Sequence, residues 1–130
     1  MNKLRSAAIH LYNLMDYEEI QYQMALLEIE GIGVTIARQL LEHFGSAKEI
    51  FNQPNNALHS LKTVGPQLIS AKSDKGLFMD AEKELTYCEK NHIQVLSTSN
   101  DNYPKRLKQC SDAPIIIYYK GNELLNNPKV

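Results

Sequence analysis

The stretch EIEGIGVTIARQLLEHFGS, residues 28–46, places two glycines around one isoleucine, between two segments with helical periodicity. Gly31 and Gly33 permit backbone angles that other residues resist, and Ile32 between them can tuck inward and hold a tight turn. Apolar residues recur at helical spacing over residues 36–44, so a helix is expected directly after the glycines. The stretch therefore predicts two helices joined by a glycine hairpin.

Further helical patterns flank this stretch. On its N-terminal side, three apolar residues form one helical stripe: Ile20, Met24 and Leu27. On its C-terminal side, Gly45 stands where a left-handed residue commonly ends a helix. Ser46 and Glu49 then form the pattern of a capping box, in which side-chain oxygens accept the free amides of a short helix.

A degenerate copy of the hairpin plan follows. Leu58, Leu61 and Val64 recur at helical spacing, Gly65 breaks the pattern, and Pro66 suits the first position of a new helix. A longer helix is expected from about Gly76 to Asn91.

The pattern changes after residue 91. HIQVLST predicts a short strand, SNDN a turn, YPKRLKQC a helical turn begun by Pro104, and APIIIYYKG a second strand ended by Gly121. Continuous apolarity in the second strand favours burial on both faces, as in a parallel sheet. The expected fold is mainly α: a helical domain over residues 1–91, then the opening strand–helix–strand of an α/β domain over 92–130 that stops before it is complete. Residues 1–14 are either an extension or an amphipathic first helix.

Composition limits the classes of function. The chain has 130 residues, of which 43% are hydrophobic and 22% charged, with a net charge of −1. Dedicated cationic nucleic-acid binders are strongly basic, so any DNA contact must be local. The sequence contains no apolar run long enough to span a membrane and no signal-peptide core. Two cysteines without metal spacing fit reduced thiols, and a cytoplasmic location is expected.

The hairpin is the strongest candidate for a binding site. The amides of Gly33, Val34 and Thr35 would be free at the start of the next helix, where helix N-termini bind anions. A backbone phosphate of DNA could approach closely, with Arg38 beside it. The alternative is that the glycines only make a turn, and Glu30, directly before Gly31, argues against tight binding.

The second turn is a weaker candidate. Its DNA-contacting residues would be Gly65 and Gln67, but a threonine stands where a first glycine would, and Pro66 removes one amide. We expect weak phosphate binding there, or none. Lys62 and Lys72 are further cations that could flank a phosphate.

No pattern predicts an enzyme or a metal site. The four histidines lack metal-ligand spacing, and Cys88 falls on an apolar helix face, where a buried thiol is expected. Tyr118 and Tyr119 could stack on bases, although within a strand such residues more often pack. We expect no catalytic residues, no metal and no cofactor.

Two stretches together resemble a known family. ALLEIEGIGVTIARQLLEHFGSAKEIF and NDNYPKRLKQCSDAPIIIYYKGN look like the start of the DNA processing protein A family (DprA, also called Smf). The first resembles the family's N-terminal helix–hairpin–helix or SAM-like domain. The second resembles the signature that opens its Rossmann-like domain, here with these structural residues: Asp101, Tyr103, Pro104, Leu107, Ala113, Pro114, Tyr118, Lys120 and Gly121.

The resemblance implies a non-enzymatic protein of bacterial DNA uptake. Members of this family bind single-stranded DNA during natural transformation and help to load the recombinase RecA. The family's main DNA groove lies in the Rossmann-like domain, in a phosphate loop expected beyond Val130, and a homodimer is possible in the full-length protein. This chain would then be an accessory DNA-backbone-binding module. The alternative is a protein-interaction or packing domain without DNA contact.

Overall fold

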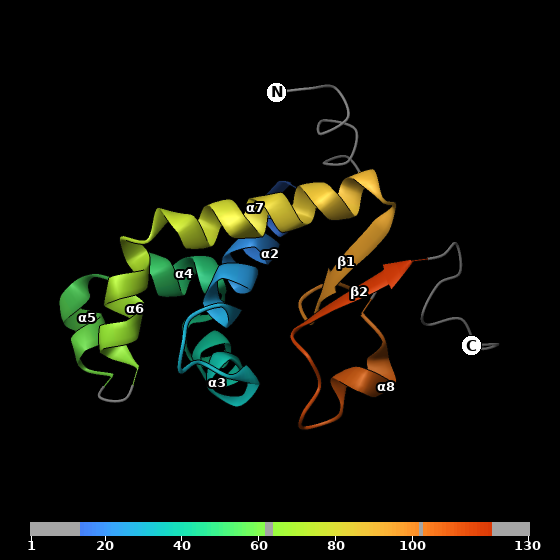
Figure 1. Ribbon diagram of the computed structural model, residues 1–130. Coiled ribbons are helices and arrows are strands. Elements are labelled where there is room, and N and C mark those ends of the chain that lie inside the picture. The colour runs from blue at the N-terminus through green and yellow to red at the C-terminus, as the bar shows by residue number, and fades with distance from the viewer. Residues whose placement is uncertain (1–13, 62–63, 102, 121–130) are drawn as a thin grey trace.

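The computed structural model describes residues 14–61, 64–101 and 103–120 (Figure 1). This part of the chain is mainly helical, with one small sheet. Its helices are α2 (Leu14–Leu27), α3 (Val34–Phe44), α4 (Ala47–Asn52), α5 (Asn55–His59), α6 (Gly65–Lys72), α7 (Lys75–Lys90) and α8 (Lys105–Lys108). Its strands are β1 (Ile93–Ser97) and β2 (Ile116–Lys120).

Helix α2 is the central element. It contacts α3, α4, α7 and β2, and Figure 1 shows α7 crossing over it. The sequence predicted one apolar stripe, but the burial of α2 is wider, because helices cover it on several sides. Leu27 is only partly buried, whereas these residues are buried: Tyr17, Ile20, Gln23, Met24, Ala25 and Leu26.

Two hydrophobic clusters meet at α2. The larger one joins α2 to the hairpin and to α3–α6, and it also contains Ile115 from the segment before β2. The smaller one joins α2 to α7 and β1 through Ile20, Leu85 and Val95, among others. Residues on both sides of the expected boundary at residue 91 therefore share the same cores. The division into two domains at residue 91 stays a prediction.

The sequence signals for helix ends predicted the end of α3 and the start of α4 correctly. Helix α3 spans Val34–Phe44 and ends at Gly45, whose φ of 92° is left-handed and whose N–H donates to the Leu41 carbonyl over 2.8 Å. The Ser46 hydroxyl accepts the Glu49 N–H at the start of α4, as the capping pattern predicted.

The second turn differs from its prediction. The helix expected through Leu58, Leu61 and Val64 ends at His59, and Leu61 lies outside any helix. The N–H of Leu61 donates to the carbonyl of Leu58, and that of Gly65 to the carbonyl of Leu61. Pro66 occupies the first turn of α6, as expected.

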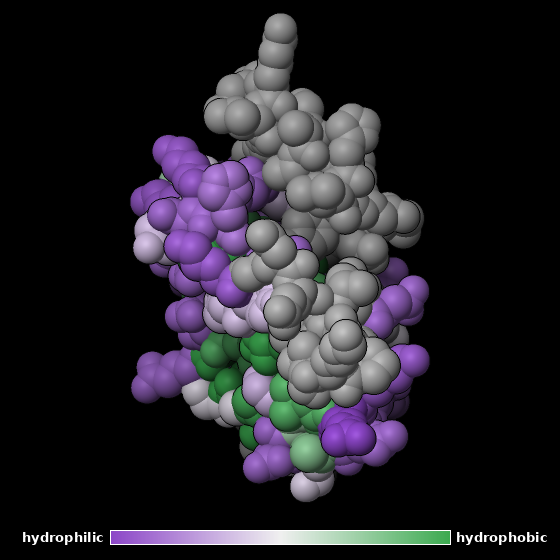
Figure 2. Space-filling model, turned by 90° about the vertical axis from the view of Figure 1, so that its right-hand side faces the viewer, coloured by the Kyte–Doolittle hydropathy of each residue, from purple (hydrophilic) through white to green (hydrophobic). Residues whose placement is uncertain are grey.

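The strands pair antiparallel, which corrects the expectation of a parallel arrangement. Ile93 lies opposite Lys120, and Ser97 lies opposite Ile116. A parallel return needs a long crossover, and α8 between the strands is only one turn. Strand β2 is also not buried on both faces, since half of Tyr118 is exposed. Figure 2 views this side of the molecule, where hydrophobic residues reach the surface between polar ones.

Candidate anion-binding hairpin

The glycine hairpin has the geometry that its sequence predicts. Gly31 has a φ of 90°, which favours glycine, and Ile32 is only 5% exposed. The Ile32 N–H donates to the Ile29 carbonyl over 3.1 Å. The apolar residue between the glycines therefore anchors the turn against the larger cluster.

Helix α3 begins without a protein cap. Gly33 is its N-cap in an extended conformation and has no side chain to accept an amide. The first bond into the helix runs from the Ala37 N–H to the Gly33 carbonyl over 2.9 Å. Among the described residues no acceptor takes the N–H groups of Gly33, Val34 or Thr35, and all three residues are exposed. We call these three N–H groups the hairpin amides.

The space beside Gly33 is open. A Cβ placed on Gly33 would meet nothing within 4 Å. The amides add to the positive end of the α3 dipole, an arrangement that binds phosphate, sulfate or carboxylate in many proteins. The arrangement can hold an anion, but by itself it does not read a base sequence.

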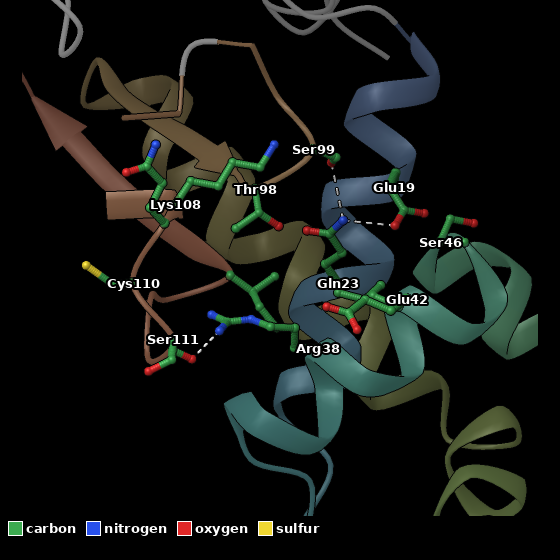
Figure 3. A pocket seen from close by; sticks show the side chains of 14 residues that line it. Glu19, Gln23, Arg38, Glu42, Ser46, Thr98, Ser99, Lys108, Cys110 and Ser111 are labelled. Atoms are coloured by element: carbon green, nitrogen blue, oxygen red, sulfur yellow. Dashed lines mark hydrogen bonds between the residues drawn. The ribbon is translucent and has the colours of Figure 1, made fainter. Parts of the chain in front are cut away.

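Arg38, expected beside a bound phosphate, is engaged elsewhere. Its Nη1 donates to the carbonyl of Ser111 (Figure 3). Its Nη2 donates to the carbonyl of Ala113. The guanidinium thus ties α3 to the segment before β2. Sequence reasoning missed this role, because backbone carbonyls distant in the chain carry no residue-type signal.

Lys72, another expected cation, also bonds away from the hairpin. Lys72 donates from Nζ to the Gln53 carbonyl over 2.6 Å and to Asn55 Oδ1 over 3.0 Å. Lys62 lies outside the described residues. The charges next to the turn are acidic instead, because Glu28 and Glu30 are both exposed there.

The acidic residues border a hollow on one side of the hairpin. This hollow has a volume of about 520 Å³, and Glu28, Glu30, Gln67 and Asp74 are among its lining residues. Gln67 packs beneath the turn: a Cβ on Gly31 would lie 3.5 Å from its Nε2. Its Oε1 is buried and has no hydrogen-bond partner in the part of the chain that the structure describes.

Gly65, in the second turn, is interior. It is buried, its N–H is bonded to Leu61, and a Cβ there would lie 2.2 Å from the Leu58 carbonyl oxygen. A residue with a side chain would not fit here, because the backbone of Leu58 lies against Gly65. Its N–H is not available to a phosphate, so Gly65 does not contact DNA as the sequence predicted.

The signature around Tyr103 forms one interlocked structure. Tyr103 is 1% exposed, and its hydroxyl donates to the Pro114 carbonyl over 2.5 Å. Burial raises the pKa of that hydroxyl above its ordinary value. Ala113, also 1% exposed, offers the carbonyl that Arg38 binds. Pro104 precedes α8, and Gly121 lies outside the described residues.

The described cysteines and potential metal ligands do not form a catalytic or metal site. Cys88 is 3% exposed, as predicted, and burial raises the pKa of its thiol. Cys110 is exposed. Among the described residues, no three His, Cys, Asp or Glu side chains gather as a metal ion requires. None of the described helices combines the length and apolarity needed to cross a membrane.

The fold and the site together define a mainly helical protein with a small antiparallel sheet and an exposed cluster of amides at a glycine hairpin. Comparison with models of protein families, with curated proteins and with solved structures finds no match to this chain.

Proposed function

We propose that this chain is an accessory DNA-contacting module of a DNA processing A type protein. The hairpin amides of Gly33, Val34 and Thr35 hold a backbone phosphate of single-stranded DNA. One observation carries the proposal: these three N–H groups are exposed and donate to no protein acceptor among the described residues, at the start of an eleven-residue helix.

Resemblance supplies the wider setting of the proposal. In this setting the helical part is a helix–hairpin–helix or SAM-like domain, and residues 92–130 open a Rossmann-like domain. The protein works without catalysis in the cytoplasm, binds single-stranded DNA during natural transformation and hands it to RecA. The interlocked Tyr103–Pro114 pair supports a structural role for the family signature. The antiparallel pairing of β1 and β2 gives no support to a parallel Rossmann-like order.

The charges around the hairpin predict a weak contact. Glu28 and Glu30 repel a phosphate, and Arg38 is occupied by carbonyl groups. Amides that touch only phosphate position a strand without reading its sequence. Binding should therefore be sequence-independent at this point and fall as salt rises.

A single substitution tests the proposed contact between the hairpin amides and a phosphate without weakening the fold. In Gly33→Asp the new carboxylate takes the N-cap role, accepts amides of the first turn and adds a negative charge. We expect at least a tenfold loss of affinity for a fluorescent single-stranded oligonucleotide at low salt, measured by anisotropy. The melting temperature should stay equal or rise. Asn56→Asp, with the same charge change at an exposed residue of α5, is the matched control.

Two results would contradict the proposal. The first is wild-type protein that does not bind the oligonucleotide at low salt. The second is Gly33→Asp binding as tightly as Asn56→Asp.

A second candidate function is protein interaction without DNA contact. The acidic hollow beside the hairpin favours it, because Glu28, Glu30 and Asp74 would attract a cationic segment of a partner. This function predicts that an arginine-rich peptide binds while DNA does not. Substituting Glu28 and Glu30 with glutamine should then weaken the peptide complex.

A further inference from the structure

A cleft lies between α2 and α3 on one side and residues 98–115 on the other. It encloses about 520 Å³, within the range of about 300–1,000 Å³ typical of ligand sites. Figure 3 shows side chains from three parts of the chain pointing into it. Its lining includes Gln23, Leu41, Glu42, Thr98, Lys108 and Ile115. We call it the α3–α8 cleft.

Gln23 forms the deep wall of this cleft with one unused acceptor. The residue is 2% exposed, and its Nε2 donates to Glu19 Oε2 over 2.9 Å and to Ser99 Oγ over 3.5 Å. Its Oε1 is buried without a hydrogen-bond partner among the described residues. In Figure 3 this oxygen points across the cleft toward Thr98. A buried amide oxygen without a donor costs free energy, so a donor supplied by a ligand is favoured here.

Neighbouring polar groups are largely committed to the fold. The Glu19 carboxylate accepts the N–H groups of Ala47 and Lys48 over 2.7 and 3.0 Å, and Arg38 binds two carbonyls. Lys108 is exposed, and its ammonium group has no ion pair or hydrogen bond within the part of the chain described here. Glu42 is the exposed anion on the facing helix. The cleft thus offers one deep acceptor, an apolar wall from Leu41 and Ile115, and a cation at its rim.

We propose that the α3–α8 cleft holds one nucleotide of a single DNA strand. The amino group of the base donates to Gln23 Oε1, its ring lies against Leu41 and Ile115, and its phosphate lies near Lys108. Cytosine carries such an amino group where thymine and uracil carry an oxygen. Two oxygens facing each other would repel, so the cleft prefers cytosine over uracil.

This inference rests on the proposed function. The two contacts lie along one helix, because Val34 opens α3 and Leu41 is seven residues further on. At 1.5 Å per residue this spacing is about 10 Å, a reach suited to neighbouring nucleotides of one strand. The hairpin amides would then grip a phosphate while the cleft selects a base.

Two oligonucleotides that differ only in this amino group test the inference. We expect the full chain to bind a deoxycytidine homo-oligomer roughly three- to tenfold more tightly than a deoxyuridine homo-oligomer of equal length, the value of one hydrogen bond. Gln23→Met keeps the side-chain volume and removes the acceptor, so it should bring both affinities to the same level. Lys108→Gln should weaken both oligomers more than Lys83→Gln, the matched control on an exposed face of α7.

The outcomes separate the two proposals. Equal binding of both oligomers by wild-type protein, with Gly33→Asp still weakening both, overturns the cleft and leaves the phosphate grip standing. A cytosine preference that survives in folded Gln23→Met also overturns it. No binding of either oligomer at low salt overturns the grip and the cleft together. If Gln23→Met does not fold, the wild-type comparison and Lys108→Gln decide.

Discussion

Three glycines of the helical part are needed for three different physical reasons. Gly31 supplies a φ of 90°, which other residues adopt at a cost. Gly65 is needed because it has no side chain: the Leu58 carbonyl oxygen lies where a Cβ would have to be. Gly33 has ordinary extended angles and open space, so its value lies in leaving the α3 amides uncovered.

A glycine series should separate these roles. We expect Gly65→Ala to lower the free energy of unfolding by about 2 kcal/mol or more, because a backbone oxygen cannot move aside cheaply. Gly31→Ala should cost roughly 1–2 kcal/mol through its left-handed backbone. Gly33→Ser should change stability by less than about 0.5 kcal/mol, since serine is a good N-cap. Urea denaturation measures all three, and a Gly65→Ala as stable as wild type would refute the crowding at α6.

The raised pKa of Tyr118 predicts that stability depends on pH in the alkaline range. Partial burial first, then the charges of Glu84, Cys88 and Glu28, raise the pKa of Tyr118 to about 12. The folded state therefore holds this proton more tightly than the unfolded chain, where the pKa is near 10. The stabilisation is complete below about pH 10 and is lost as pH rises toward about 12.

We therefore expect Tyr118→Phe to lose less stability than wild type between about pH 10 and about pH 12. Urea denaturation of both proteins across this range measures the difference. Tyr87→Phe, at an exposed tyrosine of α7, controls for the loss of one hydroxyl. Parallel curves for wild type and Tyr118→Phe would show that Tyr118 does not titrate differently in the folded protein.

At the scale of elements, α2 organises α4 as well as the core. The Glu19 carboxylate accepts the N–H groups of Ala47 and Lys48, so a residue of α2 caps the first turn of α4. The same carboxylate also accepts a hydrogen bond from Gln23 Nε2. The cap of α4 is thus only partly local: Ser46 accepts the N–H of Glu49, and the distant carboxylate of Glu19 accepts the two N–H groups before it.

This junction predicts unequal effects of two substitutions. Glu19→Ala should lower the free energy of unfolding by roughly 2–3 kcal/mol, because several hydrogen bonds to a charged group are lost. Ser46→Ala should cost about 1 kcal/mol, the usual value of an N-cap. Glu19→Gln keeps the shape without the charge and should fall between wild type and Glu19→Ala. Thermal and urea unfolding measure the order, and equal losses in Glu19→Ala and Ser46→Ala would contradict it.

At the scale of the whole molecule, the helices and the small sheet share their interior. Ile115 belongs to the larger cluster, Val95 belongs to the smaller one, and Arg38 bonds to carbonyls before β2. The end of α7 divides the chain by secondary structure, but no gap in the packing accompanies it.

Shortening the chain tests this shared interior. A protein of residues 1–91 loses the buried Val95 of β1 and the buried Ile115 before β2, and it leaves Arg38 without its carbonyl partners. We expect it to unfold at a clearly lower urea midpoint than the full chain, with a smaller dependence on urea concentration because less surface is buried. Arg38→Gln in the full chain isolates the contribution of the guanidinium. A fragment with the midpoint of the full chain would establish an independent helical domain.

Features carried by neighbouring residues could be predicted from the sequence. The hairpin with Ile32 buried, the end of α3 at Gly45, the Ser46 cap and Pro66 in the first turn of α6 all follow from local signals. Helical periodicity and capping act over a few residues, so their physics is present in a short window. The residues of the hairpin amides were named on the same basis.

Only the tertiary structure decided which distant groups meet. The partners of Arg38, the carboxylate of Glu19 at α4, the oxygen against Gly65 and the antiparallel pairing of β1 with β2 join residues far apart in the chain. Carbonyl oxygens are the same at every position, and a short strand pattern carries no direction. Such contacts depend on how the whole chain packs, and for that reason the sequence determined the elements and the hairpin, while packing determined what surrounds them.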